Sequence, residues 1–423
     1  MSGHISPRGT HQRGVLDARV VFLTHYIPLY QVRVLQTIAA AVRDFHVLLS
    51  TPIEPNRDFI PDWAGLDVAV QDTWTIRRQW KHQAGFDDPL YVHVPYDTTR
   101  RLRALKPDVV MSMELGVRSV GAAMYCRRNP KSKHVLCTYM SERTEEGRGW
   151  MRRQLRRRLV KSADAITYNG PSCLKYLKQF GVEGKPLFHL PYAADDRTVY
   201  QGPLSKDDAT TRYRLLVVGQ LSDRKGVLPL LRQVADYCLR RPNRQIELVF
   251  AGDGALKSQI QNYQCPSNLN VKLLGNVTPD DLAVWMLRCG ALVAPTLADE
   301  WMLAVNEGLQ AGLPVIGSTH SQAVTTLVKD GVNGWQYDPL EEGSLALALD
   351  SYFSESAESL ASMRATARQT VQERTPEWAA SGGLDAIRQV LGLENADSRL
   401  SDSGLSDSVG QFNPSLVEMS SDG

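Results

Sequence analysis

The segment 213–226, YRLLVVGQLSDRKG, decides the fold class of this chain. Its apolar run ends at Val218 and enters a turn bounded by Gly219 and Gly226, and a stretch of helical length follows. A short buried strand, a glycine turn and a helix make up the repeating unit of a parallel sheet covered by helices. This unit predicts an α/β fold.

The same unit recurs on both sides of this segment. Further strands are predicted at 20–23, 46–49, 108–111, 133–136 and 163–166 in the first half, and at 247–250, 271–274, 291–293 and 314–316 in the second. Apolar positions at Val34, Leu35, Ile38 and Val42 predict a helix between the first two strands. Two facing, doubly wound Rossmann-like domains are therefore expected, with ligands bound at the carboxyl ends of their strands in the cleft.

Composition suggests where these domains begin and end. The predicted divisions are a flexible leader at 1–18, a first domain at 19–192, a polar linker at 193–212, a second domain at 213–375 and a disordered Ser/Asp/Gly-rich tail at 394–423. A length of 423 residues exceeds what one core normally supports, and 43% hydrophobic residues are enough for two.

Several function classes are disfavoured by composition. The net charge of +2 gives no reason to expect nucleic-acid binding, and the six scattered cysteines form neither a CxxC pair nor a cluster with histidine. The first residues lack the apolar run of a secretory signal, and no segment has the roughly 18 apolar residues of a membrane span. We expect a cytoplasmic protein without a bound metal.

Three glycine turns follow predicted strands of the second domain. The first carries Gln220, Arg224 and Lys225, and the others lie at Gly252 and at Gly275-Asn276. Such turns let a ligand lie against bare backbone, and Lys225 adds a positive charge near a helix N-terminus. Ordinary surface turns and a solvated lysine remain the alternative reading.

Two acids stand eight positions apart in the segment 295–308, PTLADEWMLAVNEG. If one helix carries both, Asp299 and Glu307 face a single ligand, and carboxylates suit neighbouring sugar hydroxyls. The free N–H groups at Met302 and Leu303 are then candidates for binding a diphosphate. In the alternative, the first acid only complements the helix dipole and Glu307 is a surface acid.

The order of these pieces resembles glycosyltransferase family 4 (glycosyl transferases group 1), the large family of retaining, nucleotide-sugar-dependent enzymes of GT-B fold. The resemblance covers about 215–338 and rests on VVGQLSDRKG, LVFAGDG, VKLLGNVTPDDL, DEWMLAVNEGLQAGLPVIGS and VKDGVNGWQYDP, in that order. The first half is similar more faintly, through HYIPLYQVRVLQTIA, PDVVMSMELG and RGWMRRQLRRRLVKSADAITYNGPSCLKYLKQFGV. By this resemblance the first domain holds the acceptor and the second the donor, and a crossover helix at 376–393 returns to the first domain.

The resemblance also implies residue roles. Lys225 would bind the donor diphosphate, Glu307 the ribose and Asp299 the hydroxyls of the transferred sugar. The predicted donor-binding set is Gly219, Gln220, Arg224, Lys225, Gly252, Gly275, Asn276, Asp299, Met302, Leu303 and Glu307, and the predicted catalytic set is Asp299, Lys225 and Glu114. The implied mechanism is metal-independent and retaining, with the nucleotide-diphosphate sugar as substrate and no cofactor.

Three positions depart from the family pattern. Arginine is usual where Gln220 stands, and Arg224 is the candidate replacement. Glutamate is usual where this chain has Asp299 followed by Glu300. Many members have a histidine where the segment 111–114 reads MSME, so Glu114 is expected to be the polar group near the acceptor.

The acceptor is expected to be a saccharide or a lipid-linked molecule. The segment 150–161, WMRRQLRRRLVK, predicts a basic amphipathic helix with Met151, Leu155 and Leu159 on one face. Such a helix can dock on anionic lipids at the inner face of the plasma membrane, or its leucines can simply pack on the sheet beneath solvated arginines. The polar segment 141–147 is expected to line the acceptor side as a loop.

Two other functions are alternatives to a glycosyltransferase of polysaccharide or glycolipid assembly. A sugar-nucleotide-binding module that has lost turnover fits the departures at Gln220 and at the missing histidine. A nicotinamide-dependent Rossmann enzyme requires GxGxxG after the first strand, and the segment 24–28, THYIP, lacks it.

Overall fold

The first domain is built on a seven-stranded parallel sheet. The computed structural model describes residues 15–55, 57, 60–146, 149–195, 202, 204 and 209–393. In order across the sheet the strands are β3 (Asp67–Val70), β2 (Val42–Leu49), β1 (Leu16–Thr24), β6 (Val109–Met113), β7 (Lys133–Thr138), β8 (Ala165–Tyr168) and β9 (Leu187–His189). The chain builds outward from β1 in both directions, as in a doubly wound sheet.

The second domain repeats this plan with a six-stranded parallel sheet. Its strands are, in order, β12 (Leu269–Gly275), β11 (Ile246–Ala251), β10 (Arg214–Val218), β13 (Ala291–Ala294), β14 (Val315–Ser318) and β15 (Gly334–Tyr337). The order reverses between β10 and β13, and ligands of such sheets bind at the carboxyl ends of the strands beside this switch point.

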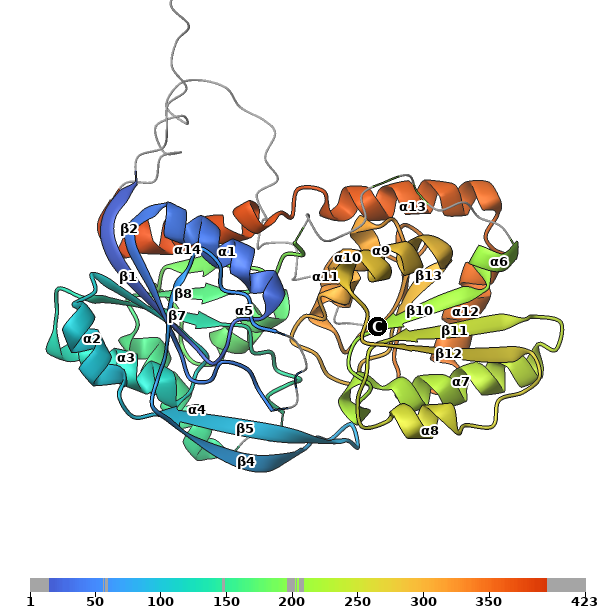
Figure 1. Cartoon of the computed structure of the whole chain (residues 1–423), viewed down its shortest axis with the longest axis horizontal. Helices are drawn as coiled ribbons and strands as arrows, with labels where there is room; N and C mark the ends of the chain where they lie inside the picture. The colour runs from blue at the N-terminus through green and yellow to red at the C-terminus, as the bar shows by residue number, and fades with distance from the viewer. Residues whose placement is uncertain are drawn as a thin grey trace, which may run out of the picture.

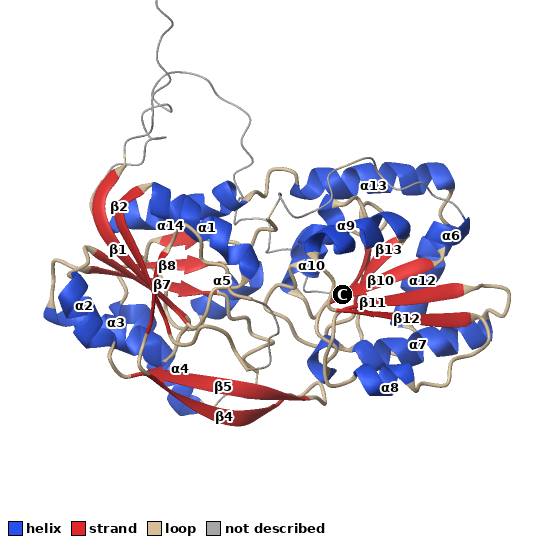
Figure 2. Cartoon of the chain, viewed as in Figure 1, coloured by secondary structure: helices blue, strands red, loops and turns tan. Residues whose placement is uncertain are grey.

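Helices cover the faces of both sheets (Figure 2). The first domain has α1 (Leu29–Ala40), α2 (Thr98–Leu105), α3 (Val117–Arg128), α4 (Trp150–Ser162) and α5 (Pro171–Lys178). The second has α6 (Ala209–Arg212), the short 3₁₀ turn η1 (Asp223–Lys225), α7 (Val227–Arg240), α8 (Lys257–Gln261), α9 (Pro279–Arg288), α10 (Ala304–Gln310), α11 (Gln322–Leu327), α12 (Ser344–Ser354) and α13 (Ala357–Val371). The predicted fold class is confirmed.

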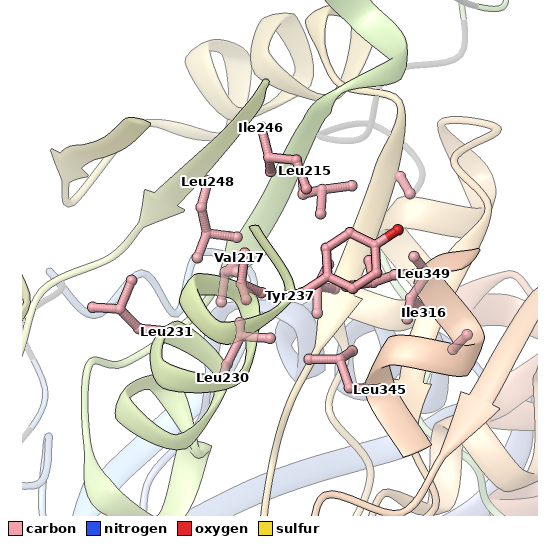
Figure 3. Close-up of a cluster of buried hydrophobic side chains, with 14 of the residues drawn as sticks. Leu215, Val217, Leu230, Leu231, Tyr237, Ile246, Leu248, Ile316, Leu345 and Leu349 are labelled. Carbon is pink, nitrogen blue, oxygen red and sulfur yellow. The ribbon is translucent and has the colours of Figure 1, made fainter. Parts of the chain in front are cut away.

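The core of the second domain shows why the segment 213–226 folds as it does. Leu215 and Val217 of β10 point to the same face, where they meet Leu230 and Leu231 of α7 (Figure 3). Tyr237 continues this contact farther along the helix, and Leu345 and Leu349 of α12 close the cluster. The apolar strand and the apolar helix stripe therefore bury each other, and the turn between them is held at the sheet edge.

The last helix belongs to the first domain. After α13 the chain crosses back, and α14 (Pro376–Val390) packs on α1 and on β7, β8 and β9, as Figure 1 shows. Ala379, Ala380, Ala386 and Ile387 are fully buried in the core of the first domain. Thr375 caps this helix by accepting a hydrogen bond from the backbone N–H of Trp378, and Pro376 occupies its first turn. The crossing of the C-terminal helix, expected from the resemblance, is confirmed.

An antiparallel hairpin projects from the first domain. It consists of β4 (Thr73–Lys81) and β5 (Asp87–Pro95), which form a separate two-stranded sheet. Figure 1 shows it running below the first sheet toward the second domain. The sequence analysis did not predict this element.

Three local expectations differ from the structure. Val42 was assigned to a helix but opens β2, because α1 ends at Ala40. β1 begins at Leu16, inside the segment predicted as a leader. Ala193 and Ala194, at the start of the predicted polar linker, are buried. Residues 1–14 of the predicted leader, 196–201, 203 and 205–208 of the linker and the predicted tail from 394 lie outside the described residues.

Candidate active site in the interdomain cleft

The glycine turns of the second domain lie together at one edge of its sheet. Gly219 donates its N–H to the carbonyl of Ala251, and Gly252 donates to the carbonyl of Gly275. Both Gly219 (φ 131°) and Gly252 (φ 148°) have positive φ, and a Cβ at Gly252 would collide with the carbonyl of Gly219. Hydrogen bonds therefore join three turns that are separated in sequence, and their glycines leave backbone there without a Cβ.

The turn η1 docks on the loop that follows β13. Leu297 donates its backbone N–H to the carbonyl of Arg224 at 2.9 Å, and Thr296 Oγ1 donates to the same carbonyl at 3.2 Å. Gly226 (φ 67°) permits this approach, because a Cβ there would collide with the carbonyl of Pro295. The two loops carry the predicted cations and the predicted acid, and this docking brings them together.

Four side chains form what we call the cleft charge cluster: Asp88, Arg224, Lys225 and Asp299. Lys225 forms an ion pair with Asp299, and Arg224 lies 3.3 Å from the same carboxylate oxygen. Arg224 also donates from Nε to Asp88 of β5 at 3.0 Å. Asp299 additionally accepts the backbone N–H of Trp301 at 3.2 Å. Two of the predicted donor-binding cations thus share one predicted catalytic acid.

The charges of this cluster are mostly buried. Burial alone would raise the pKa of Asp299, but Lys225 and Arg224 hold it well below its usual range. Burial lowers the pKa of Lys225, and Asp299 opposes that effect. The carboxylate is therefore ionised, and so is the arginine beside it, across the pH range in which enzymes work.

The segment after Asp299 corrects one step of the sequence analysis. The helix was expected to include both acids, but α10 begins only at Ala304 and leaves Asp299 in an extended loop. Met302 has a positive φ of 68°, a conformation that a residue with a Cβ seldom adopts. The loop turns sharply there, so the eight-residue spacing does not place Asp299 and Glu307 on one helix face.

Glu307 lies in the first turn of α10 and is partly buried. Burial raises the pKa of its carboxyl group to about 7. A carboxyl group with this property is a functional-site candidate, because burying an ionisable side chain is costly unless a partner or a ligand compensates. The structure therefore disfavours the reading of Glu307 as an ordinary surface acid.

Glu300 points to the first domain and away from the cleft charge cluster. Burial raises the pKa of Glu300 well above its usual range, while hydrogen bonds with Thr144 and Ser141 oppose that effect. Glu300 therefore bonds to the first domain, and Asp299 is the acid of the cleft charge cluster.

The first domain contributes Glu114 at the carboxyl end of β6. This residue has a positive φ of 74°, and its carboxylate accepts hydrogen bonds from Tyr139 and from Arg118 (3.3 Å). Nδ1 of His25, in the loop after β1, lies 3.8 Å from the same carboxylate. Burial would raise the pKa of Glu114, but His25 and Arg118 lower it to about 2. Strained residues that persist in a fold cluster at functional sites, and Glu114 and Met302 both fit that pattern.

Aromatic rings connect the two sides of the cleft. The ring centroid of Tyr192 lies 6.0 Å from that of Tyr139, the partner of Glu114, and 6.3 Å from that of Trp301, the neighbour of Met302 in the second domain. An apolar pocket opens in the first domain beside these rings, lined by Tyr30, Tyr139, Tyr192 and the α1 side chains Val34, Leu35 and Ile38.

A pocket of about 470 Å³ lies between the domains, and Asp299 is in its wall. Its lining comes mainly from the predicted loop at 141–147, through residues between Ser141 and Glu146, and from residues just before and within α11. Gln322 crosses the boundary: its Nε2 donates to the carbonyls of Glu300 (2.8 Å) and Tyr139 (3.2 Å), and its Oε1 accepts the N–H of Cys173. Residues of both domains therefore form the cleft.

Sequence reasoning missed three residues of this region: His25, Asp88 and Gln322. His25 directly follows the first predicted strand, and the carboxyl end of a strand is where a functional side chain is expected, so position alone was a usable signal. Asp88 and Gln322 act through contacts with the other domain, and a local sequence pattern gives no information about such contacts.

The predicted basic helix is observed as α4. Part of its apolar face packs in the core, and part is exposed. Leu155 and Leu159 pack in the core of the first domain, whereas Trp150 and Met151 are 73% and 72% exposed. Arg156 is buried and forms an ion pair with Glu145. None of the described helices is long and apolar enough to cross a membrane.

Comparison with known proteins agrees with this geometry. Residues 212–355 match the family model described as Glycosyl transferases group 1. Two curated relatives are the uncharacterized glycosyltransferases MJ1178 and MJ1607 of Methanocaldococcus jannaschii, which are 31% identical over 120 residues and 30% identical over 144 residues. These matches cover 28% and 33% of this chain but only 32% and 36% of the relatives, so the chain spans about a third of the length of the curated relatives it matches.

Solved structures resemble almost the whole chain. Anabaena Alr3699/HepE in complex with UDP has a TM-score of 0.65 at 15% identity, covering 88% of this chain and 100% of that one. Sucrose-phosphate synthase from Thermosynechococcus elongatus has a TM-score of 0.64 at 15% identity, covering 88% and 99%. The chain therefore has the GT-B fold of two Rossmann-like domains, and its segment 212–355 matches the group 1 glycosyl transferases.

Proposed function

We propose that the protein is a glycosyltransferase that moves a sugar from a nucleoside-diphosphate sugar to an acceptor across the interdomain cleft. The observation that carries this proposal is the contact of Lys225 and Arg224 with Asp299, at the sheet edge formed by the glycine turns. Two fixed cations suit a diphosphate, and a carboxylate beside them suits the hydroxyls of the sugar that the diphosphate carries.

The donor is proposed to lie along the second domain. Its base rests near Gly252 and Gly275-Asn276, its ribose hydroxyls bind Glu307, and its diphosphate meets Lys225 and the backbone of Met302 and Leu303. Uridine diphosphate is the first nucleotide to test, because Alr3699/HepE was solved with UDP and with UDP-glucose.

Transfer is proposed to retain the anomeric configuration and to need no metal ion. As the bond from the anomeric carbon to the phosphate oxygen breaks, Lys225 and Arg224 stabilise the negative charge on the leaving diphosphate. The acceptor hydroxyl attacks the same face of the sugar, and its proton passes to a leaving phosphate oxygen. The anomeric configuration of the product, read by nuclear magnetic resonance, tests retention, and activity in excess EDTA tests metal independence.

The acceptor is proposed to enter from the first domain, beside Glu114. The ionised carboxylate can accept a hydrogen bond from an acceptor or sugar hydroxyl, and the neighbouring apolar pocket offers Tyr30 and Tyr192 as stacking surfaces for a saccharide or a lipid-linked acceptor. Surface polysaccharide or glycolipid assembly is the proposed setting.

Docking on an anionic bilayer is proposed for the exposed beginning of α4. Trp150 and Met151 are exposed beside Arg152 and Arg153, an arrangement that suits the boundary between headgroups and acyl chains. The test is co-sedimentation with phosphatidylcholine vesicles that contain about 30% phosphatidylglycerol. Trp150→Ala with Met151→Ala should lower the bound fraction, and Trp74→Ala, which removes an exposed tryptophan of β4, is the matched control.

The central experiment is a transfer assay with UDP-glucose and related nucleotide sugars, run beside a thermal-shift screen of nucleoside diphosphates. Stabilisation by one nucleotide, together with release of that nucleotide from its sugar, supports the proposal. Stabilisation without any hydrolysis or transfer would instead identify a sugar-nucleotide-binding module without turnover.

A further inference from the structure

The hairpin β4–β5 reaches from the first domain into the proposed donor site. Its two strands pair only with each other among the described strands, and most of β4 is exposed. Isolated two-stranded hairpins are marginally stable in water, so contacts with other elements have to fix its position: β5 packs against α3 of its own domain and against η1 of the second domain. Figure 1 shows that the tip of the hairpin points toward the second domain.

The tip is held by an aromatic contact with the second domain. Phe86 is 3% exposed and packs in a small cluster with Leu297 and Ala298, the residues just before Asp299. His82 stacks on Phe86 with ring centroids 4.7 Å apart, and its Nε2 lies 2.9 Å from the carbonyl oxygen of Arg143. The tip therefore touches the loops on both sides of the cleft.

Asp88 of β5 is the charged hairpin residue that contacts the proposed donor side. Its carboxylate accepts the hydrogen bond from Nε of Arg224 at 3.0 Å, and the two side chains are 18% and 16% exposed. The cleft charge cluster thus contains two cations, Arg224 and Lys225, and two carboxylates, Asp88 and Asp299, and its formal charge is zero.

A diphosphate that enters this neutral cluster finds no uncompensated cation among its four side chains, so one carboxylate has to be displaced for a phosphate to bind there. Asp299 is held by Lys225, by Arg224 and by the backbone of its own loop. Asp88 is bound through Arg224, and it stands on a hairpin that neither large sheet supports. Asp88 therefore has fewer stabilising contacts than Asp299 and is the carboxylate that a diphosphate displaces more easily.

Building on the proposed function, we propose that Asp88 competes with the donor diphosphate for Arg224 and thereby sets donor affinity. In the empty protein the hairpin closes the donor site and neutralises Arg224. Donor binding replaces the carboxylate by a phosphate oxygen, and the net charge of the protein groups that face the diphosphate rises by one.

The test compares Asp88→Asn with Asp87→Asn by isothermal titration with UDP, GDP and ADP. Asp87 is the neighbouring residue of β5, is exposed, and loses the same charge when changed. For the nucleotide that the wild type binds most tightly, Asp88→Asn should lower Kd roughly five- to tenfold, because a competing charged hydrogen bond is gone, and Asp87→Asn should leave Kd within about twofold.

A second comparison asks whether the effect passes through Arg224. In a protein that already carries Arg224→Gln, the further change Asp88→Asn should leave Kd unchanged. If Asp88→Asn weakens donor binding or leaves it unaltered while the wild type binds, the competition is refuted and the proposed function stands. If the wild type binds none of the three nucleotides, the donor-site assignment fails and this inference fails with it.

Discussion

The two sides of the cleft each stabilise an ionised carboxylate, but they do so in different ways. In the first domain, Glu114 is partly buried among partners of its own domain, namely Tyr139, Arg118 and His25. In the second domain, Asp299 and the two cations neutralise one another, and a residue of the opposite domain completes the set. The proposed acceptor side is therefore already arranged, whereas the proposed donor side has to exchange partners when a diphosphate binds.

The largest effect is expected on the donor side. Lys225→Ala removes the cation that pairs with Asp299. Because the departing diphosphate is then less stabilised, the transfer rate should fall about 100-fold or more. It should also abolish the thermal shift produced by the bound nucleotide. Lys329→Ala changes an exposed lysine of the same domain and should have no effect. Full activity of Lys225→Ala would contradict the assignment.

A pH-dependent effect is expected at Glu307. Its pKa in the fold is raised to about 7 from 4.5, so burial destabilises the ionised form above pH 7, and this penalty fades as the pH falls from about 7 to about 4.5. Glu307→Gln should raise the free energy of unfolding by on the order of 2 kcal/mol at pH 8 and change it little at pH 4.5. Urea unfolding at both pH values measures this difference.

Two observations control the Glu307 experiment. Glu342→Gln, a change at an exposed acid of the same domain, should have no comparable effect. The gain in stability should come with weaker nucleotide binding, because Glu307 is the proposed ribose ligand. An equal gain at both pH values would mean that ionisation of Glu307 is not its cause.

A smaller effect is expected on the acceptor side. Glu114→Gln keeps the shape but removes the charge, and should lower kcat about tenfold while the thermal shift with nucleotide is unchanged. Because the pKa of Glu114 is near 2, the variant should lower the whole pH–rate profile above pH 5 without moving it. Glu183→Gln, at an exposed position of the first domain, is the control. Loss of the nucleotide shift would place Glu114 on the donor side.

The smallest effect concerns the link between the two sides. Gln322→Ala removes hydrogen bonds to the carbonyls of Tyr139 and Glu300 and should cost about 1 kcal/mol of stability. Gln261→Ala, at an exposed end of α8, should cost less. If differential scanning calorimetry shows one transition in the wild type and two in Gln322→Ala, this side chain couples the domains.

The sequence predicts for a physical reason that the residues of the proposed donor side gather at one edge of the sheet. Its glycine turns, Lys225 and Asp299 lie directly after strands, and parallel strands bring such positions to one edge. The helical spacing from Asp299 to Glu307 was wrong, because the positive φ of Met302 delays the helix to Ala304, and a residue with a Cβ gives no signal of that turn.

The hairpin and the acceptor side were harder to predict. Alternating β-branched and aromatic residues at 73–76 and 91–94, with Gly85 between them, were a usable hairpin signal, but the hairpin covers no sheet and has no apolar face of the usual kind. His25 and Glu114 are 89 positions apart in the sequence, and only the pairing of β1 with β6 explains why they meet.

The buried face of α14 has a consequence for synthesis of the chain. The first domain needs Ala379, Ala380 and Ile387 to complete its core, and these residues leave the ribosome after the entire second domain. Domains otherwise tend to fold in the order in which they are made. Here the first domain is translated first, but its core is completed last. Its apolar face therefore stays uncovered until α14 has been synthesised.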